Sequence, residues 1–442
     1  MNRLLSVAGA LALASAAVQA HAWQYTIVGG PSFQQNLAPG AALVADTDGD
    51  VCLLSNDRDF GNMGFAHVYG FHAADGAPTP LHASLGSREL ATFGIDCRFG
   101  DPIVGYSAYG DVEARRWSRL AGFLPAPGSL GPDFPLPSYS AIEPVRLGVD
   151  AARHAVIVRD KIGGSSVDLQ AYDLSTLSPL WQTGIAVMPL SYPRVRDMQV
   201  AADGSVTLIG TADDTNTPTM GVFLLTYDAA GQPNGPNFQF GDPSYGQVAD
   251  LALSPGGIGY VVRRDREFMR DELLRMDAQT PWGVALDIGC CGTRMVHALA
   301  ALPDDGALAV SNDVFGWASS LSRFHADGTL MWRADSVPVD MPGMQLMGLV
   351  GDRAGRALAI YTEPAPYGPP QALRTVRLRA YSQTGMELWT RTIDNVRFDG
   401  GSPLRSTVSS DDVVVLAFEV YDVNAGASGI LVQGFPLDQP FP

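Results

Sequence analysis

Short apolar runs, each preceded by a polar or glycine-containing turn, recur along almost the whole chain. The runs are rich in Val, Ile and Leu, which favours buried β-strands, and the turns resemble Asp46-Thr-Asp-Gly-Asp50. Glycine suits such turns because tight hairpins need a positive φ. The turns recur with a period of about 50 residues, near Gly49, Gly100, Arg153, Gly204, Gly257, Gly306, Gly355 and Asp411.

A second pattern follows each of these turns, an apolar strand that closes on another turn and often on a tryptophan. The clearest copies end at Trp181, Trp332 and Trp389. A period near 50 residues with about four strands per unit is typical of β-propeller blades. We therefore predict an all-β fold, a single β-propeller with eight four-stranded blades. Seven blades, with the unit around Phe99 to Trp117 misread, is one alternative; a solenoid or two β-sandwiches is another.

The two ends of the chain predict how the ring closes. The eighth unit ends at Phe435-Pro-Leu-Asp438, which leaves no room for its fourth strand. The segment Trp23-Gln-Tyr-Thr-Ile27 is similar to Trp181-Gln-Thr-Gly-Ile185 and Trp389-Thr-Arg-Thr-Ile393. We expect this N-terminal strand to complete the last blade, which would remove an open sheet edge.

Composition narrows the function classes. The chain has 442 residues, is 46% hydrophobic and 17% charged, and carries a formal net charge of −17. This is too apolar for a disordered protein, and the negative charge disfavours nucleic acid and anionic lipid as partners. We expect a monomer without a membrane span, which binds a protein or a small-molecule ligand.

Residues 1–22 are typical of a secretory signal peptide. Arg3 is followed by the apolar segment from Leu4 to Val18 and by the cleavage pattern Ala20-His-Ala22. Cleavage after Ala22 would leave a propeller domain of residues 23–442 in the periplasm or outside the cell. An N-terminal membrane anchor is the alternative, although the apolar stretch is short for a span.

The chain contains four cysteines, and export would place them where thiols pair. Cys52 and Cys97 fall on adjacent predicted blades near one face, so we expect a Cys52–Cys97 disulfide. Cys290 and Cys291 are neighbours in sequence. They form either a strained disulfide near the central axis, Cys290–Cys291, or a pair of free thiols.

The tryptophan-ended units resemble the repeats of the quinoprotein alcohol dehydrogenase-like (PQQ-like) family of eight-bladed propellers. Ala380 to Trp389 and Arg323 to Trp332 keep the glycine and tryptophan of its Ala-x-Asp-x-x-x-Gly-x-x-x-Trp repeat. The resemblance implies that these tryptophans dock neighbouring blades. Some members carry a disulfide between adjacent cysteines beside the quinone, to which Cys290-Cys291 is similar in kind.

Propeller topology places the loops after the second and fourth strands of each blade on one face, which we call the long-loop face. Loops that vary in length are where function usually resides. The candidate binding residues there are Arg263, Arg264 and Arg266, which could grip a carboxylate, and Trp317. A merely solvated rim is the alternative. We expect no metal site, and we interpret Asp46 to Asp50 as a hairpin turn rather than part of a calcium loop.

These observations predict an exported propeller that acts as a non-enzymatic binding or scaffold module through its long-loop face. No nucleophile elbow, zinc-binding helix motif or phosphate loop is found in the sequence. The alternative is a quinone-dependent or other oxidoreductase, or a hydrolase, with its site in the axial funnel. We expect no cofactor; pyrroloquinoline quinone and calcium belong to that alternative.

Overall fold

The structure, a computed structural model, consists of β-strands joined by turns. It describes residues 22–28, 34–37, 43–58, 63–88, 91–109, 116–123, 130–135, 142–161, 167–176, 178–185, 190–214, 220–234, 238–240, 247–265, 270–277, 284–286, 288, 294–313, 319–335, 345–362, 373–397, 404–422 and 427–439. Within these ranges we find no helix that is long and apolar enough to cross a membrane.

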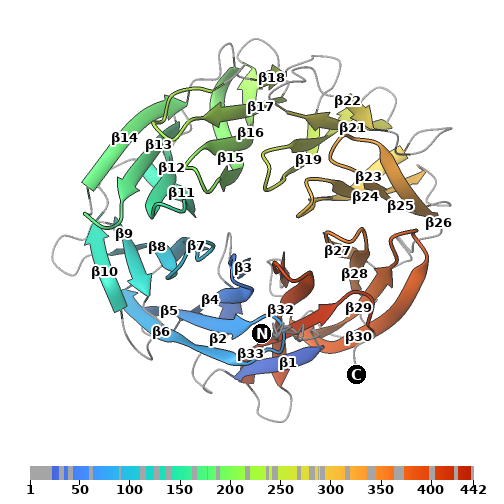
Figure 1. Ribbon diagram of the computed structural model, residues 1–442, viewed down its shortest axis with the longest axis horizontal. Coiled ribbons are helices and arrows are strands. Elements are labelled where there is room, and N and C mark those ends of the chain that lie inside the picture. Colours follow the sequence, from blue (N-terminus) through green and yellow to red (C-terminus); the bar gives the residue numbers. More distant parts are fainter. Residues whose placement is uncertain are drawn as a thin grey trace, which may run out of the picture.

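In the first half of the chain the strands pair as antiparallel sheets in chain order, with one inner strand nearest the axis and one outer strand at the rim (Figure 1). The first sheet holds β2 (Gln34–Leu37), β3 (Leu43–Ala45), β4 (Asp50–Arg58), β5 (Met63–His72) and β6 (Pro78–Arg88). The next three hold β7 (Ala91–Asp96), β8 (Ile103–Tyr109), β9 (Arg116–Phe123) and β10 (Leu130–Pro135); β11 (Ile142–Val149), β12 (His154–Lys161), β13 (Val167–Asp173) and β14 (Ser178–Ile185); and β15 (Leu190–Val200), β16 (Val206–Asp214), β17 (Met220–Tyr227) and β18 (Phe238–Phe240).

The second half repeats this plan. Two four-stranded sheets hold β19 (Gln247–Leu253), β20 (Gly259–Asp265), β21 (Arg270–Met276) and β22 (Val284–Leu286); and β23 (Arg294–Ala301), β24 (Ala307–Asp313), β25 (Ser319–Phe324) and β26 (Leu330–Asp335). The last sheet holds β27 (Gln345–Gly351), β28 (Ala357–Thr362), β29 (Leu373–Tyr381), β30 (Glu387–Arg397), β31 (Leu404–Val408), β32 (Val413–Asp422), β33 (Ala427–Pro436) and β1 (Trp23–Val28).

The fold is therefore an all-β propeller, as predicted. The last sheet divides into two antiparallel units, β27 to β30 and β31 to β33 with β1, which are joined only by the pairing of Val396 with Val420. Within the described residues we interpret the arrangement as eight blades, numbered from the unit of β3 to β6, and Figure 1 shows them around a common axis.

The N-terminal strand completes the last blade, which confirms the predicted closure. β1 pairs antiparallel with β33 along its whole length, from Trp23 opposite Gly434 to Val28 opposite Gly429. The indole Nε1 of Trp23 also donates a hydrogen bond of 2.7 Å to the carbonyl of Ala73 in the first blade. The two ends of the chain are thus held in one sheet.

The turns between first and second strands have the backbone that the sequence predicts. Gly49, Gly100, Gly204, Gly257 and Gly355 all have positive φ. In the sixth and eighth of these turns the positive φ falls on Asp305 and Asp412, each one residue from the expected centre. Aspartate tolerates this conformation because its short polar side chain bonds locally.

The hydrophobic core lies between the blades. Val51 and Leu53 of β4 pack toward the last blade, in a cluster with Val413 and Ile430. The intervening Cys52 and Leu54 instead pack with β7 and β8 of the second blade. Successive side chains of a strand point to opposite faces, so a middle strand covered on both sides must be apolar throughout, which explains the uninterrupted runs.

At four junctions among the described residues, a tryptophan of an outer strand docks one blade on the next. Trp181 donates from its Nε1 to the carbonyl of Ala229 at 2.9 Å, and Trp389 donates to Leu437 at 3.0 Å. The docking turns leave room for the indole: a Cβ added to Gly231 would lie 2.4 Å from the Trp181 ring. Gly231 also has a positive φ of 73°. Any larger residue there would both clash and strain the turn.

We predict that Trp23→Ala destabilises the whole propeller by about 3–5 kcal/mol, because it removes a buried indole from the joint between the first and last blades. The measurement is equilibrium unfolding in guanidinium chloride. The matched control is Thr26→Ala, since Thr26 is exposed on the same strand. Equal midpoints for the two variants would mean that Trp23 does not carry the joint.

Candidate functional site

A cavity of about 750 Å³ lies among the inner strands of the propeller. These strands, labelled β3, β7, β11, β15, β19, β23 and β27 in Figure 1, surround the axis. Much of the wall is aliphatic, with side chains such as Val44, Leu147, Met198, Leu302 and Leu349. Its charged lining residues are Asp46, Asp96, Arg98, Asp197 and Arg353. Polar side chains share the wall with the aliphatic ones, a combination that suits a ligand with both apolar and polar parts.

Arg98 joins three blades beside this cavity. Its guanidinium donates to both carboxylate oxygens of Asp96, with NH2 to Oδ2 at 2.7 Å. From the same group NH1 donates to the carbonyl of Val200, two blades away in sequence, at 3.0 Å. Asp96 also accepts the backbone N–H of Val149 at 2.7 Å. The pair thus ties the second, third and fourth blades together next to the axis.

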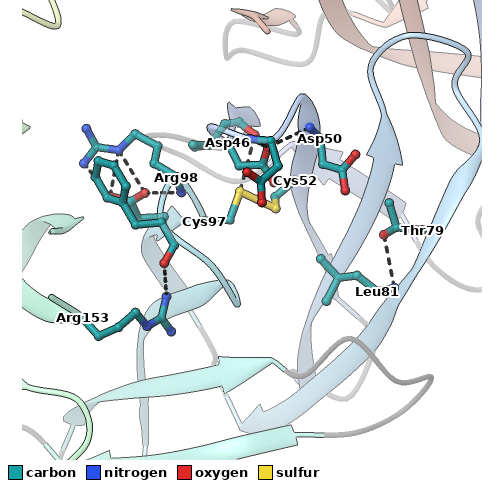
Figure 2. Close-up of a disulfide and its surroundings, with 12 residues drawn as sticks. Asp46, Asp50, Cys52, Thr79, Leu81, Cys97, Arg98 and Arg153 are labelled. Carbon is teal, nitrogen blue, oxygen red and sulfur yellow. Dashed lines mark hydrogen bonds and ion pairs between the residues drawn. A yellow bond between two sulfur atoms is a disulfide. The ribbon is translucent and has the colours of Figure 1, made fainter. Parts of the chain in front are cut away.

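Asp46 belongs to a turn, as the sequence predicts. Its Oδ1 accepts backbone N–H groups from Asp48 at 2.8 Å and Asp50 at 2.7 Å. Burial raises the pKa of the Asp46 carboxyl, against the lowering effect of these hydrogen bonds. Figure 2 shows Asp46 and Asp50 beside the disulfide of the first blade.

Asp197 is the third carboxyl group in the wall of the cavity, after Asp46 and Asp96. It accepts the N–H of Met198 at 2.8 Å. Burial raises the pKa of Asp197, while hydrogen bonds from the Met198 and Leu253 backbones and the nearby Arg146 charge oppose the rise. A carboxyl with a raised pKa inside a cavity is a frequent mark of a functional site.

A β-bulge recurs at the same height in six inner strands. In each of the strands β7, β11, β15, β19, β23 and β27, one residue has no partner on the second strand of the blade. This residue lies three or four positions before the end of its strand. The skipped residues are Phe93, Val145, Arg196, Ala249, His297 and Met347. Bulges redirect side chains, and Arg196, Ala249 and His297 are exposed. Three of the six bulges therefore expose their extra residue.

The Cys52–Cys97 disulfide is present, as predicted. It joins β4 of the first blade to the residue that follows β7 in the second, across a separation of 45 residues. Figure 2 shows it close to Arg98 and Asp46, which border the cavity. A disulfide at this position indicates an oxidising environment.

Arg263 and Arg264 lie near the end of β20, and the structure pairs both with β21. Arg264 binds Asp271 through two hydrogen bonds of 2.8 and 2.9 Å, and this pairing raises the pKa of Arg264. Asp271 is fully buried and also accepts the N–H of Val296 at 2.7 Å. Arg263 forms an ion pair with Glu272. The carboxylates that these arginines grip thus belong to the chain itself.

The other predicted site residues lie outside the described residues. These are Arg266, Trp317, Cys290 and Cys291, and with them the loops of the long-loop face, including 59–62, 215–219, 314–318 and 363–372. The binding surface and the adjacent disulfide therefore stay predictions. Among the residues that are described, no group of three or more His, Cys, Asp or Glu side chains could hold a metal ion.

The predicted binding residues are on the long-loop face, and only the enzymatic alternative placed a site in the axial funnel. Arg194 and Arg196, on the inner strand β15, are exposed although the strand lies at the centre of the disc. A signal was available. In the segment Arg194-Val-Arg-Asp197, charged residues stand on an inner strand whose two faces are covered by the neighbouring blades. Charged residues are unexpected at such positions.

Comparisons with known proteins give structural matches only. No family model and no curated protein matches the chain. Among solved structures it is similar to the β-propeller domain of the Trilobed protease from Pyrococcus furiosus, with 11% identity and a TM-score of 0.43 over 79% of this chain and 97% of that one. The Dos1 propeller matches at 10% identity and a TM-score of 0.45 over 96% of both chains.

Puromycin hydrolase matches at 16% identity and a TM-score of 0.45, over 87% of this chain and 59% of that one. The chain thus spans little more than half of that enzyme. At these scores the matches carry no inference about activity, and the fold rests on the strand pairing itself. The resemblance to quinoprotein-like repeats stays a prediction.

We predict that reducing the Cys52–Cys97 disulfide lowers the free energy of unfolding by roughly 3–4 kcal/mol, because the open chain gains loop entropy. Unfolding midpoints with and without dithiothreitol measure the effect. In the double variant Cys52→Ala/Cys97→Ala the reductant should change nothing further. If dithiothreitol shifted the unfolding midpoint of that variant equally, the effect would belong to Cys290 and Cys291 instead.

Asp197→Asn should stabilise the protein at neutral pH. The pKa of Asp197 is higher in the folded state than in the unfolded chain, so the folded state binds the proton more tightly. Losing this proton as pH rises therefore lowers the free energy of unfolding. Asparagine can accept the same backbone hydrogen bonds without a charge. The gain in melting temperature should therefore be largest at pH 7 and vanish as pH falls below the ordinary value of 3.8. A gain that is independent of pH would contradict this account.

Proposed function

We propose that this chain is an exported, non-enzymatic β-propeller that binds a ligand or partner at its long-loop face and admits an apolar group into the axial cavity. The observation that carries the proposal is the cavity of about 750 Å³ with its aliphatic wall. The predicted signal peptide and the Cys52–Cys97 disulfide support export.

Most of the charged groups of the wall have structural tasks. Asp96 is held by Arg98 and the Val149 N–H. Arg353 donates to the carbonyl of Ser409 at 2.8 Å. Charged side chains that are already bonded to the protein fix the shape of the cavity, and they are poor acids, bases or nucleophiles. Burying about 100 Å² of apolar ligand surface would contribute about 2.5 kcal/mol, so the wall is suited to binding.

Backbone hydrogen bonds between neighbouring blades join the turns that lie between first and second strands. Thr47 donates its backbone N–H to Arg98 at 3.2 Å, and Ala151 donates to Ala202 at 3.2 Å. Arg98 reaches from the second blade to the fourth. A ligand that enters from the long-loop face would meet the inner-strand bulges first and the aliphatic wall next.

We expect the neutral dye Nile red to bind the full mature chain with increased fluorescence. Ala202→Trp should weaken this binding roughly tenfold, because Ala202 is an exposed residue that lines the cavity. The matched control is Ala152→Trp, at an exposed alanine of the neighbouring turn that does not line the cavity. Equal binding by both variants, or none by the parent protein, would refute binding in the cavity.

The enzymatic alternative is tested with the same protein. We expect that adding pyrroloquinoline quinone, calcium and a primary alcohol produces no reduction of an artificial electron-acceptor dye. Dye reduction that needs all three additions would replace the binding proposal with a quinone-dependent dehydrogenase.

A further inference from the structure

Two exposed arginines, Arg194 and Arg196, lie on β15, the innermost strand of the fourth blade. Along β15 exposed and buried residues alternate, with Arg194 and Arg196 exposed and Val195 and Met198 buried. β16 covers the outer edge of this strand, and β11 and β19 lie on its two sides. The inner edge of β15 is paired with no strand among the described residues and faces the axis. Arg196 is moreover the extra residue of the bulge.

Neither arginine has a partner within the described part of the chain, where no hydrogen bond or ion pair involves its side chain. Their neighbours are engaged: Arg98 binds Asp96, and Arg146 donates from NH2 to the carbonyl of Arg196 at 2.6 Å. In a chain of net charge −17, two unpaired guanidiniums at one point of a channel are a distinctive feature.

The guanidiniums that gather near this point outnumber the carboxyl groups. Asp197 follows Arg196 directly, and burial raises the pKa of its carboxyl. Asp250, on the next inner strand, accepts the N–H of Leu251 at 2.9 Å, and burial raises its pKa as well. Arg146 adds a third guanidinium from β11. His297 is exposed on β23.

We propose that Arg194 and Arg196 bind the carboxylate of a small organic acid whose aliphatic body occupies the axial cavity. The inference rests on the proposed binding function and names the chemistry of its ligand. Guanidinium groups form paired, charge-assisted hydrogen bonds with carboxylates.

The two halves of the site are adjacent along a single strand. Asp197 and Met198 line the cavity, and they are the next two residues after Arg196. A strand advances about 3.3 Å per residue, so an acid held at the arginines can extend its chain directly along the aliphatic wall. A neutral ligand would leave the arginines unused, and a short acid would leave the wall unused.

The test compares three probes on the full mature chain by isothermal titration calorimetry: decanoate, decanol and acetate. We expect decanoate to bind at least about tenfold more tightly than either of the others, which is the scale of one charge-assisted hydrogen bond. Arg194→Gln and Arg196→Gln should each remove most of the preference for decanoate over decanol and leave decanol binding unchanged. Circular dichroism should show that the variants stay folded.

The matched control is Arg391→Gln, which removes the same charge from the outer strand β30 and should keep the preference. Equal affinity for decanoate and decanol, or a preference that survives both substitutions, would overturn the arginine site while leaving the cavity as a binding site. Equal affinity for acetate and decanoate would overturn the role of the aliphatic wall. Failure of decanol, decanoate and Nile red alike would instead refute the proposed function.

Discussion

The pairing of the N-terminal strand with the last strand of the chain is the constraint on which this structure depends. A propeller blade buries both faces against its neighbours, so a ring that is open at one point would leave two faces and one sheet edge exposed. β1 closes this point by pairing with β33, and Trp23 extends the joint into the first blade through the carbonyl of Ala73. The inner strands can enclose a cavity only when the ring is closed.

The inter-blade contacts explain why the axial wall is rigid enough to bind. At the rim, indoles such as Trp181 and Trp389 seat on the turns of the following blade. Near the axis, Arg98 with Asp96 and the Cys52–Cys97 disulfide join the first blades. A buried guanidinium does the same between later blades, where Arg323 binds Asp304 and the carbonyl of Asp352. Burial lowers the pKa of Arg323, so this joint costs desolvation and relies on its hydrogen bonds.

The sequence predicted those features that repeat. Turn glycines, apolar runs and terminal tryptophans identify the propeller, and the likeness of Trp23 to Ile27 with Trp181 to Ile185 predicted the closure. Placing Cys52 and Cys97 near one face of adjacent blades then predicted their disulfide. Features that occur once were missed. The reach of Arg98 to Val200 spans two blades and leaves no periodic trace. The bulge recurs in several inner strands, but the skipped residue differs from strand to strand, so no residue pattern reveals it.

The pairing of Arg263 and Arg264 with Glu272 and Asp271 was also overlooked, although cross-strand register could have indicated it. In a hairpin each residue of one strand lies opposite one of the next, and these pairs are opposite each other in β20 and β21. Opposite charges there satisfy each other before any ligand arrives. The arginines of β15 differ because Arg194 lies opposite Thr211 on β16, and Arg196, the bulge residue, lies opposite no residue of that strand.

Hydrogen–deuterium exchange of the full mature chain tests the ring closure most directly. The account predicts that the amides of Trp23 to Val28 are protected as strongly as those of β33 and are released together with them as denaturant is added. If those amides exchange at the rate of an unstructured chain while β32 and β33 stay protected, the closure, and the axial site that depends on it, is contradicted.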